Sequence, residues 1–124
     1  MDRLYILEKN FLPEILLDKE KSVFRIKGKS IPENAENFYR PVLKWLETYF
    51  DNPNPTTELE IMLHYYNSSS ARSISKIIKM FDDKFNEGLD VKVLWVVLHE
   101  DEEMINNGED FKILFKLPIE IKTI

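Results

Sequence analysis

In the stretch ELEIMLHYY, Glu58 to Tyr66, strongly apolar residues occupy every second position, and this pattern indicates the fold class. A period of two is typical of a β-strand with one buried face and one partly wet face. The buried set is predicted to be Leu59, Ile61, Leu63 and Tyr65, and the wetter set Glu58, Glu60, Met62, His64 and Tyr66. By contrast, Val91 to Leu98 is apolar on both faces, as in a central strand. The contrast predicts a sheet with helices mostly on one face.

Two helical patterns surround the alternating strand. Apolar residues from Ala35 to Phe50 recur at helical spacing, and Ser30 with Glu33, or Asn34, supplies the cap. Pro41 lies within this pattern and predicts a kink or a break near Asn37 to Pro41, because proline lacks a backbone donor. The second helix carries its inner stripe on Ile74, Ile77, Ile78, Phe81 and Phe85, with Gly88 at its carboxyl end.

The two ends of the chain add further strands. Ile15 to Leu17 and Val23 to Lys27 flank the polar DKEK and predict a β-hairpin, with Leu4 to Leu7 as a further short strand. Met104, Ile105, Phe111, Leu114 and Phe115 fit a third helix, with Gly108 as a weak point, and Leu117 to Lys122 fits a final strand. Strands separated by helices form right-handed, parallel crossovers. The prediction is an α/β fold with a mixed, mainly parallel sheet and an N-terminal β-hairpin.

Composition bounds the class of protein. The chain has 124 residues, a net charge of −5 and 44% hydrophobic residues, which fits one domain, 1–124. The absence of cysteine excludes disulfide scaffolds, thiol catalysis and thiolate metal sites. The acidic balance argues against nucleic-acid binding, and the longest apolar run, Val93 to Leu98, is too short for membrane insertion. The charged start MDRLYILEKN does not resemble a signal peptide, so we expect a cytoplasmic protein.

Motifs for enzymatic chemistry are weak. The GKS at 28–30 lacks the preceding glycine of a phosphate-binding loop, because Val23 stands there. The run His99 to Glu103 fits an acidic first helical turn better than a metal site. His64 and His99 could act as acid–base groups of a small hydrolase, but no spacing links either to a nucleophile. We expect no cofactor and no metal, and we keep the hydrolase as an alternative.

The segment Asn67 to Ser70 joins a strand to the start of a helix. One serine hydroxyl suffices to cap the helix, which leaves two serines unexplained. Free backbone N–H groups, together with the following Arg72 and Lys76, suit a phosphate group.

Three stretches together resemble the SiaC family of bacterial regulatory phosphoproteins. They are KGKSIPENAENFYRPVLKWLETYF (Lys27 to Phe50), LHYYNSSSARS (Leu63 to Ser73) and LWVVLHEDEEMINNGEDF (Leu94 to Phe111). The S-x-P-E-N and Y-x-N-[ST]-S-S elements carry the likeness. The resemblance implies a STAS-like fold and a non-enzymatic partner switch. By the same resemblance, we expect a Ser/Thr kinase to phosphorylate the protein, a metal-dependent phosphatase to remove the phosphate, and the unphosphorylated form to bind a target such as a diguanylate cyclase.

By this resemblance the phosphoacceptor is Ser68, and Ser69 or Ser70 supplies the helix cap. The partner-binding residues are expected around both strand–helix junctions: Glu33, Asn34, Asn67, Ser69, Ser70 and Arg72. Parallel strands bring such junctions to the same end of a sheet. A structural adaptor that is never phosphorylated is the other alternative.

Overall fold

The computed structural model describes residues 1–124. Its elements, in chain order, are β1 (Leu4–Ile6), β2 (Glu14–Asp18), β3 (Val23–Ser30), α1 (Ala35–Tyr49), β4 (Thr56–Tyr66), α2 (Ser68–Asn86), β5 (Asp90–Val97), α3 (Glu102–Leu114) and β6 (Ile119–Thr123).

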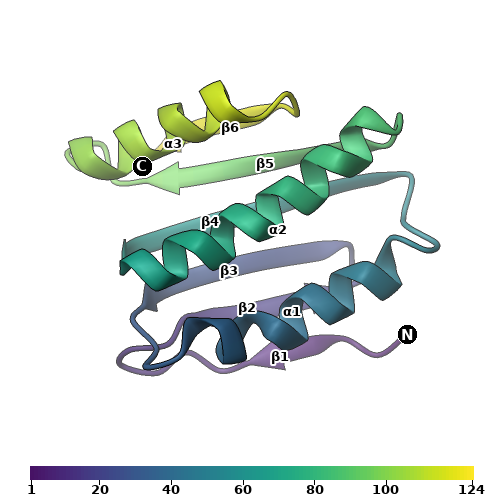
Figure 1. Ribbon diagram of the computed structural model, residues 1–124, viewed down its shortest axis with the longest axis horizontal. Helices are drawn as coiled ribbons and strands as arrows, with labels where there is room; N and C mark the ends of the chain where they lie inside the picture. Colours follow the sequence, from purple (N-terminus) through teal and green to yellow (C-terminus); the bar gives the residue numbers. More distant parts are fainter.

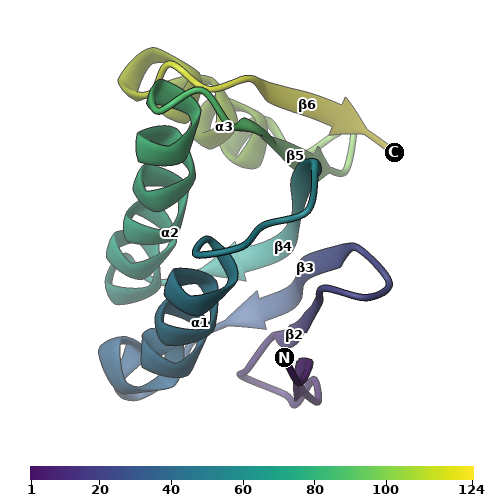
Figure 2. The ribbon, with the colours of Figure 1, turned by 90° about the vertical axis from the view of Figure 1, so that its right-hand side faces the viewer.

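The strands form one six-stranded sheet in the order β1-β2-β3-β4-β5-β6. The pairs β1–β2 and β2–β3 are antiparallel, and the three later pairs are parallel. Each crossover from β3 onward steps to the next strand in the same direction, so right-handed connections place every helix on the same face. Figures 1 and 2 show α1, α2 and α3 together on that face. The predicted mixed sheet with one helical layer and an N-terminal hairpin is confirmed.

The core lies between this helical layer and the sheet. Alternate residues of the strands point into it, and Leu59, Ile61 and Trp95 are all but fully buried. From the helices come Tyr39, Leu46 and Tyr49 of α1 and Phe81 of α2, among others. Aromatic rings from both layers meet in the core: Phe24 of β3 packs on Tyr49 of α1, and Trp95 of β5 packs on Phe111 of α3.

Helix α1 continues through Pro41 without interruption, so of the predicted kink or break, the break does not occur. Proline removes one backbone donor and costs the helix free energy. The buried face of α1 offsets that loss, because Val42 and Leu46 just beyond the proline are fully buried.

The alternation of β4 fails at its end. Tyr65, predicted to be buried, is 52% exposed, whereas the Tyr66 ring packs edge-on against Trp95 at 6.3 Å. The β3–β4 pairing shifts register between Gly28 and Lys29, where Gly28 has a φ of 122°. An irregularity of this kind changes which side chain faces the core, which the sequence pattern did not signal.

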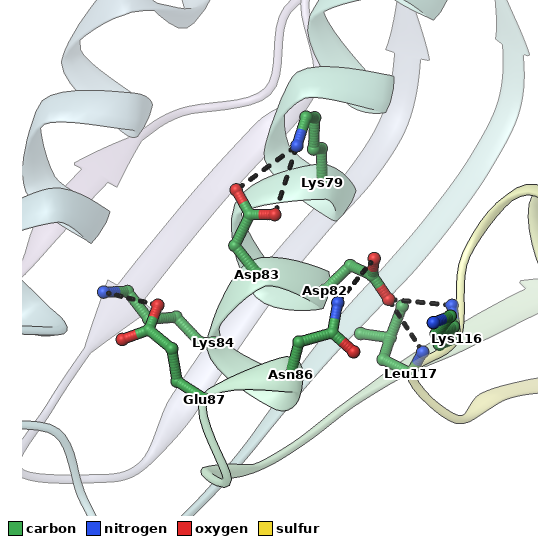
Figure 3. A network of polar contacts seen from close by, with 8 residues as sticks. All are labelled: Lys79, Asp82, Asp83, Lys84, Asn86, Glu87, Lys116 and Leu117. Carbon is green, nitrogen blue, oxygen red and sulfur yellow. Dashed lines mark hydrogen bonds and ion pairs between the residues drawn. The ribbon is translucent and has the colours of Figure 1, made fainter.

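Helix α3 packs against Trp95 through two contacts. The Trp95 indole donates to the Met104 carbonyl at 2.8 Å, and a Cβ added to Gly108 would lie 2.6 Å from the Trp95 ring. Gly108, predicted as a weak point of the helix, is therefore a site of close packing. Figure 3 shows how the segment between α3 and β6 is held: the Asp82 carboxylate of α2 accepts from the backbone N–H groups of Lys116 and Leu117 at 2.8 and 2.9 Å.

Candidate functional site

The carboxyl ends of β3 and β4 lie side by side, as parallel pairing requires. Ser30 ends β3 and Tyr66 ends β4, and the two residues are paired in register. The backbone N–H of Asn67 donates to the Ser30 carbonyl at 3.2 Å. The loop before α1 and the start of α2 therefore meet at one edge of the sheet, on the left in Figure 1.

Asn67 caps helix α2. Its side-chain oxygen accepts from the backbone N–H of Ser70 at 2.9 Å and from the Ser69 hydroxyl at 3.1 Å. The expectation that Ser69 or Ser70 supplies the cap is wrong. An asparagine side chain caps as well as serine does, and the residue before a helix is the one with the required extended backbone.

The four serines in the first two turns of α2 differ in their exposure to solvent. Ser68 is exposed and its hydroxyl makes no hydrogen bond to another protein group, whereas Ser69 is half-buried. Ser70 is fully buried and Ser73 is 6% exposed. A buried hydroxyl cannot reach a kinase or a partner surface, so Ser70 does not belong among the partner contacts where the sequence placed it.

A chain of hydroxyl groups lies beneath the exposed serines. The Ser70 Oγ donates to the Ser30 carbonyl at 3.0 Å and lies 2.8 Å from the Ser30 Oγ, which in turn lies 2.6 Å from the Tyr39 hydroxyl. Burial raises the pKa of Tyr39 to about 12, although its hydrogen bond with Ser30 acts in the opposite direction. These groups join β3, α1 and α2 at one point.

A shallow hollow of about 200 Å³ lies between the starts of the two helices. It is lined by Glu33, Asn34, Ala35, Glu36, Ser69, Arg72, Ser73 and Lys76. Two carboxylates from α1 and its loop thus face two cations from α2. Arg72 makes no ion pair and follows Ser68 by one helical turn, within reach of a group on that side chain.

Glu33 and Asn34 have different roles in the loop before α1. The Asn34 side chain accepts from the backbone N–H of Asn37 at 3.0 Å and is the cap of α1. Glu33 is exposed and has no hydrogen-bond partner, so its carboxylate is available for another molecule.

The residues of the hydrolase alternative lie apart from this site. His64 lines a surface hollow with Glu8, Lys9, Asn10 and Lys29. His99 is exposed, with its Nε2 3.4 Å from Glu100 and its Nδ1 3.3 Å from the Ile124 carbonyl. Neither ring contacts a hydroxyl group. The acidic run is the predicted first turn of a helix, with Asp101 as its cap.

Sequence reasoning placed the loop that starts at Ser30 near the serine run, but it missed Tyr39 and the hydrogen bonds that join Ser30 to Tyr39 and Ser70. The helical spacing marks Tyr39 only as a core residue, and Ser30 was considered as a helix cap and as part of the incomplete phosphate-binding motif. No local pattern signals that side chains 40 positions apart share a hydrogen bond.

Nowhere do three histidine, aspartate or glutamate side chains gather as metal ligands. None of the helices has the length and apolarity needed to cross a bilayer.

Comparison with known proteins gives consistent matches. The model of the SiaC family regulatory phosphoproteins matches residues 6–124. An uncharacterized protein of Pseudomonas aeruginosa strain UCBPP-PA14 is 25% identical over 122 residues, which cover 98% of this chain and 97% of that protein. SiaC of Pseudomonas aeruginosa has a similar structure, with a TM-score of 0.91, 24% identity and complete coverage of both chains.

A further solved structure contains a diguanylate cyclase. It is the crystal structure of the cyclase SiaD in complex with its activator SiaC from Pseudomonas aeruginosa. The matching chain has a TM-score of 0.92 and 24% identity, over 98% of this chain and 99% of that one. The structural matches show a shared fold over the whole length.

Proposed function

The chain belongs to the SiaC family of regulatory phosphoproteins, and from this premise we propose that it is a partner switch controlled by phosphorylation of Ser68, and not an enzyme. In the unmodified state it binds and regulates a target protein. A Ser/Thr kinase adds the phosphate and a metal-dependent phosphatase removes it. Because the structurally similar SiaC activates the cyclase SiaD, the proposed target is a diguanylate cyclase.

The observation that carries the proposal is the accessibility of Ser68. It is the one serine of the run with an exposed hydroxyl that is not engaged elsewhere in the protein. It also occupies the first position of α2. A kinase therefore meets one acceptor, and its modification breaks no existing hydrogen bond.

The local structure can accommodate the phosphate. The first N–H groups of a helix lack partners within it, and Asn67 satisfies only that of Ser70, which leaves those of Ser68 and Ser69 available. A phosphoserine brings about −1.5 to −2 charges and three acceptor oxygens. These backbone donors and the unpaired Arg72 can stabilise it, so the fold survives modification.

A partner covering this surface would not tolerate the phosphate. The proposed contact surface is Glu33, Asn34, Asn67, Ser69 and Arg72, with Ser68 in its midst. A charge left desolvated and unpaired in an interface costs several kcal/mol. On the order of 3 kcal/mol weakens binding more than a hundredfold, which is enough for a switch.

The test is to incubate the purified chain with ATP and the proposed cognate Ser/Thr kinase, and to map the product by tandem mass spectrometry. Phosphate on Ser68, and none on the Ser68→Ala variant, is the expected result. Phosphate on Ser69, Ser70 or Ser73 alone would move the site. No phosphate from a demonstrably active kinase would leave the adaptor alternative. The hydrolase alternative instead requires a metal or nucleotide that stays with the chain in native mass spectrometry.

A further inference from the structure

In the buried series of hydroxyl groups beneath Ser68, the direction of each hydrogen bond from donor to acceptor is fixed. The Ser30 carbonyl can only accept, so the single Ser70 hydroxyl proton points to it at 3.0 Å. The 2.8 Å contact between the two serine oxygens must then use the Ser30 proton. The 2.6 Å contact with Tyr39 must use the tyrosine proton, because Ser30 has none left. The order is Tyr39 to Ser30 to Ser70 to the Ser30 carbonyl.

Every hydroxyl group of this hydrogen-bonded series has a partner within the protein and is shielded from solvent. Ser30, Tyr39 and Ser70 each have no exposed surface, and the protein has no buried side-chain oxygen or nitrogen without a partner. A buried network in this condition defines one arrangement of its elements, since any shift leaves a polar group unpaired. The Ser30 carbonyl accepts a second bond from the Asn67 backbone, which strengthens the same junction.

We propose that Tyr39, Ser30 and Ser70 are positioning residues that lock the first turn of α2 to the loop before α1. The inference rests on the proposed function, because these two segments carry Ser68 and the proposed contacts Glu33 and Asn34. The lock makes them one rigid surface, and a change at Ser68 is transmitted through it to Glu33 and Asn34. Ser70 therefore serves the switch without being modified.

The chain offers a matched control at the other end of α1. The Tyr49 hydroxyl contacts Thr57 at 2.7 Å and accepts from the Asn54 backbone at 3.0 Å. Tyr39→Phe and Tyr49→Phe each remove one buried phenol oxygen from the same helix. Only the first touches the proposed lock.

Hydrogen exchange of the purified full chain tests the lock. We expect Tyr39→Phe to raise amide exchange in residues 30–34 and 67–72 by about tenfold, the factor for losing one modest hydrogen bond. Tyr49→Phe should raise exchange at residues 52–57 and leave the site segments within about twofold. A uniform rise in both variants, or a rise in Tyr39→Phe confined to α1, would overturn the proposal.

A second readout follows transmission directly. In backbone NMR spectra, Ser68→Asp should shift the signals of residues 31–34 as well as those of 67–72. In the Tyr39→Phe background the shifts should stay within α2. Equal shifts at 31–34 in both backgrounds, or none in either, would overturn the proposal. Neither measurement needs a kinase or a target, so a failure of the proposed function is distinguishable from a failure of the lock.

Discussion

The side-chain oxygen of Asn67 lies 2.9 Å from the backbone nitrogen of Ser70 and caps the helix that begins with Ser68. This bond separates the capping role from the proposed regulatory role. Because Asn67 caps the helix, Ser68 at the first helical position can be modified without loss of the cap.

This division of roles predicts that substitutions at Asn67 and Ser68 change the stability by different amounts. Asn67→Ala should lower the free energy of unfolding by about 1 kcal/mol, the usual loss for an N-cap. Ser68→Ala should change it by less than about 0.5 kcal/mol, because the Ser68 side chain is exposed and bonds to no protein group. Urea unfolding of the two variants measures both values. A loss at Ser68 equal to that at Asn67 would contradict this division.

A second pair of variants separates folding from binding in the loop before α1. Asn34→Ala should cost about 1 kcal/mol of stability, because Asn34 caps α1. Glu33→Ala should leave stability within about 0.5 kcal/mol and weaken target binding by about tenfold, since its exposed carboxylate has no partner in the chain. Unfolding curves and a binding titration check the two halves. Unchanged affinity for Glu33→Ala would remove Glu33 from the contact surface.

The stability of the protein should fall in strong alkali through Tyr39. Its pKa is raised to about 12 by burial, from 10.0 in the unfolded chain. Folding therefore favours the neutral phenol, and this contribution is complete below pH 10 and is lost as the pH rises from 10 to 12. The two-unit difference corresponds to about 3 kcal/mol. Urea unfolding between pH 9 and 12 should show that the free energy of unfolding falls less steeply with pH for Tyr39→Phe than for the unsubstituted chain. Parallel pH dependences of the two proteins would refute the contribution of Tyr39.

Two neighbouring aspartates of α2 should differ in importance. Asp82 accepts two backbone N–H groups from the segment before β6, whereas Asp83 pairs on the surface with Lys79 (Figure 3). Asp82→Ala should cost about 1–3 kcal/mol, because it leaves both donors unpaired. Asp83→Ala should cost less than about 0.5 kcal/mol, as is usual for an exposed pair one helical turn apart. Chemical unfolding of both variants measures the difference, and equal losses would argue against the Asp82 contact.

The architecture could be predicted because it depends on periodic patterns. The alternation from Glu58 and the apolar run from Val93 indicate different environments for the two strands, and the helical stripes supply the single layer that covers one face. The end of β4 could not be predicted, because the register shift beside Gly28 depends on pairing between two strands. The helix does not break at Pro41 for a related reason, since tertiary packing offsets a local loss.

The candidate site was predictable in its location and less so in its details. The order of strands and helices brings Asn34 and Asn67 to one edge of the sheet. The burial of Ser70, the capping by Asn67 and the bond from Ser30 to Tyr39 depend on how three elements meet in space. Composition and residue spacing do not indicate these contacts between elements.

The central claim is that one phosphate on Ser68 decides whether the chain binds its target. The most direct measurement compares two preparations, the unmodified chain and the chain carrying phosphoserine at position 68, in their affinity for the proposed target, a diguanylate cyclase. The account predicts that the phosphorylated chain stays folded and binds at least about a hundredfold more weakly. Ser68→Ala should bind as the unmodified chain does, and Ser68→Asp should fall between, because one carboxylate carries less charge than a phosphate. Equal affinities of the phosphorylated and unmodified chains would contradict the account.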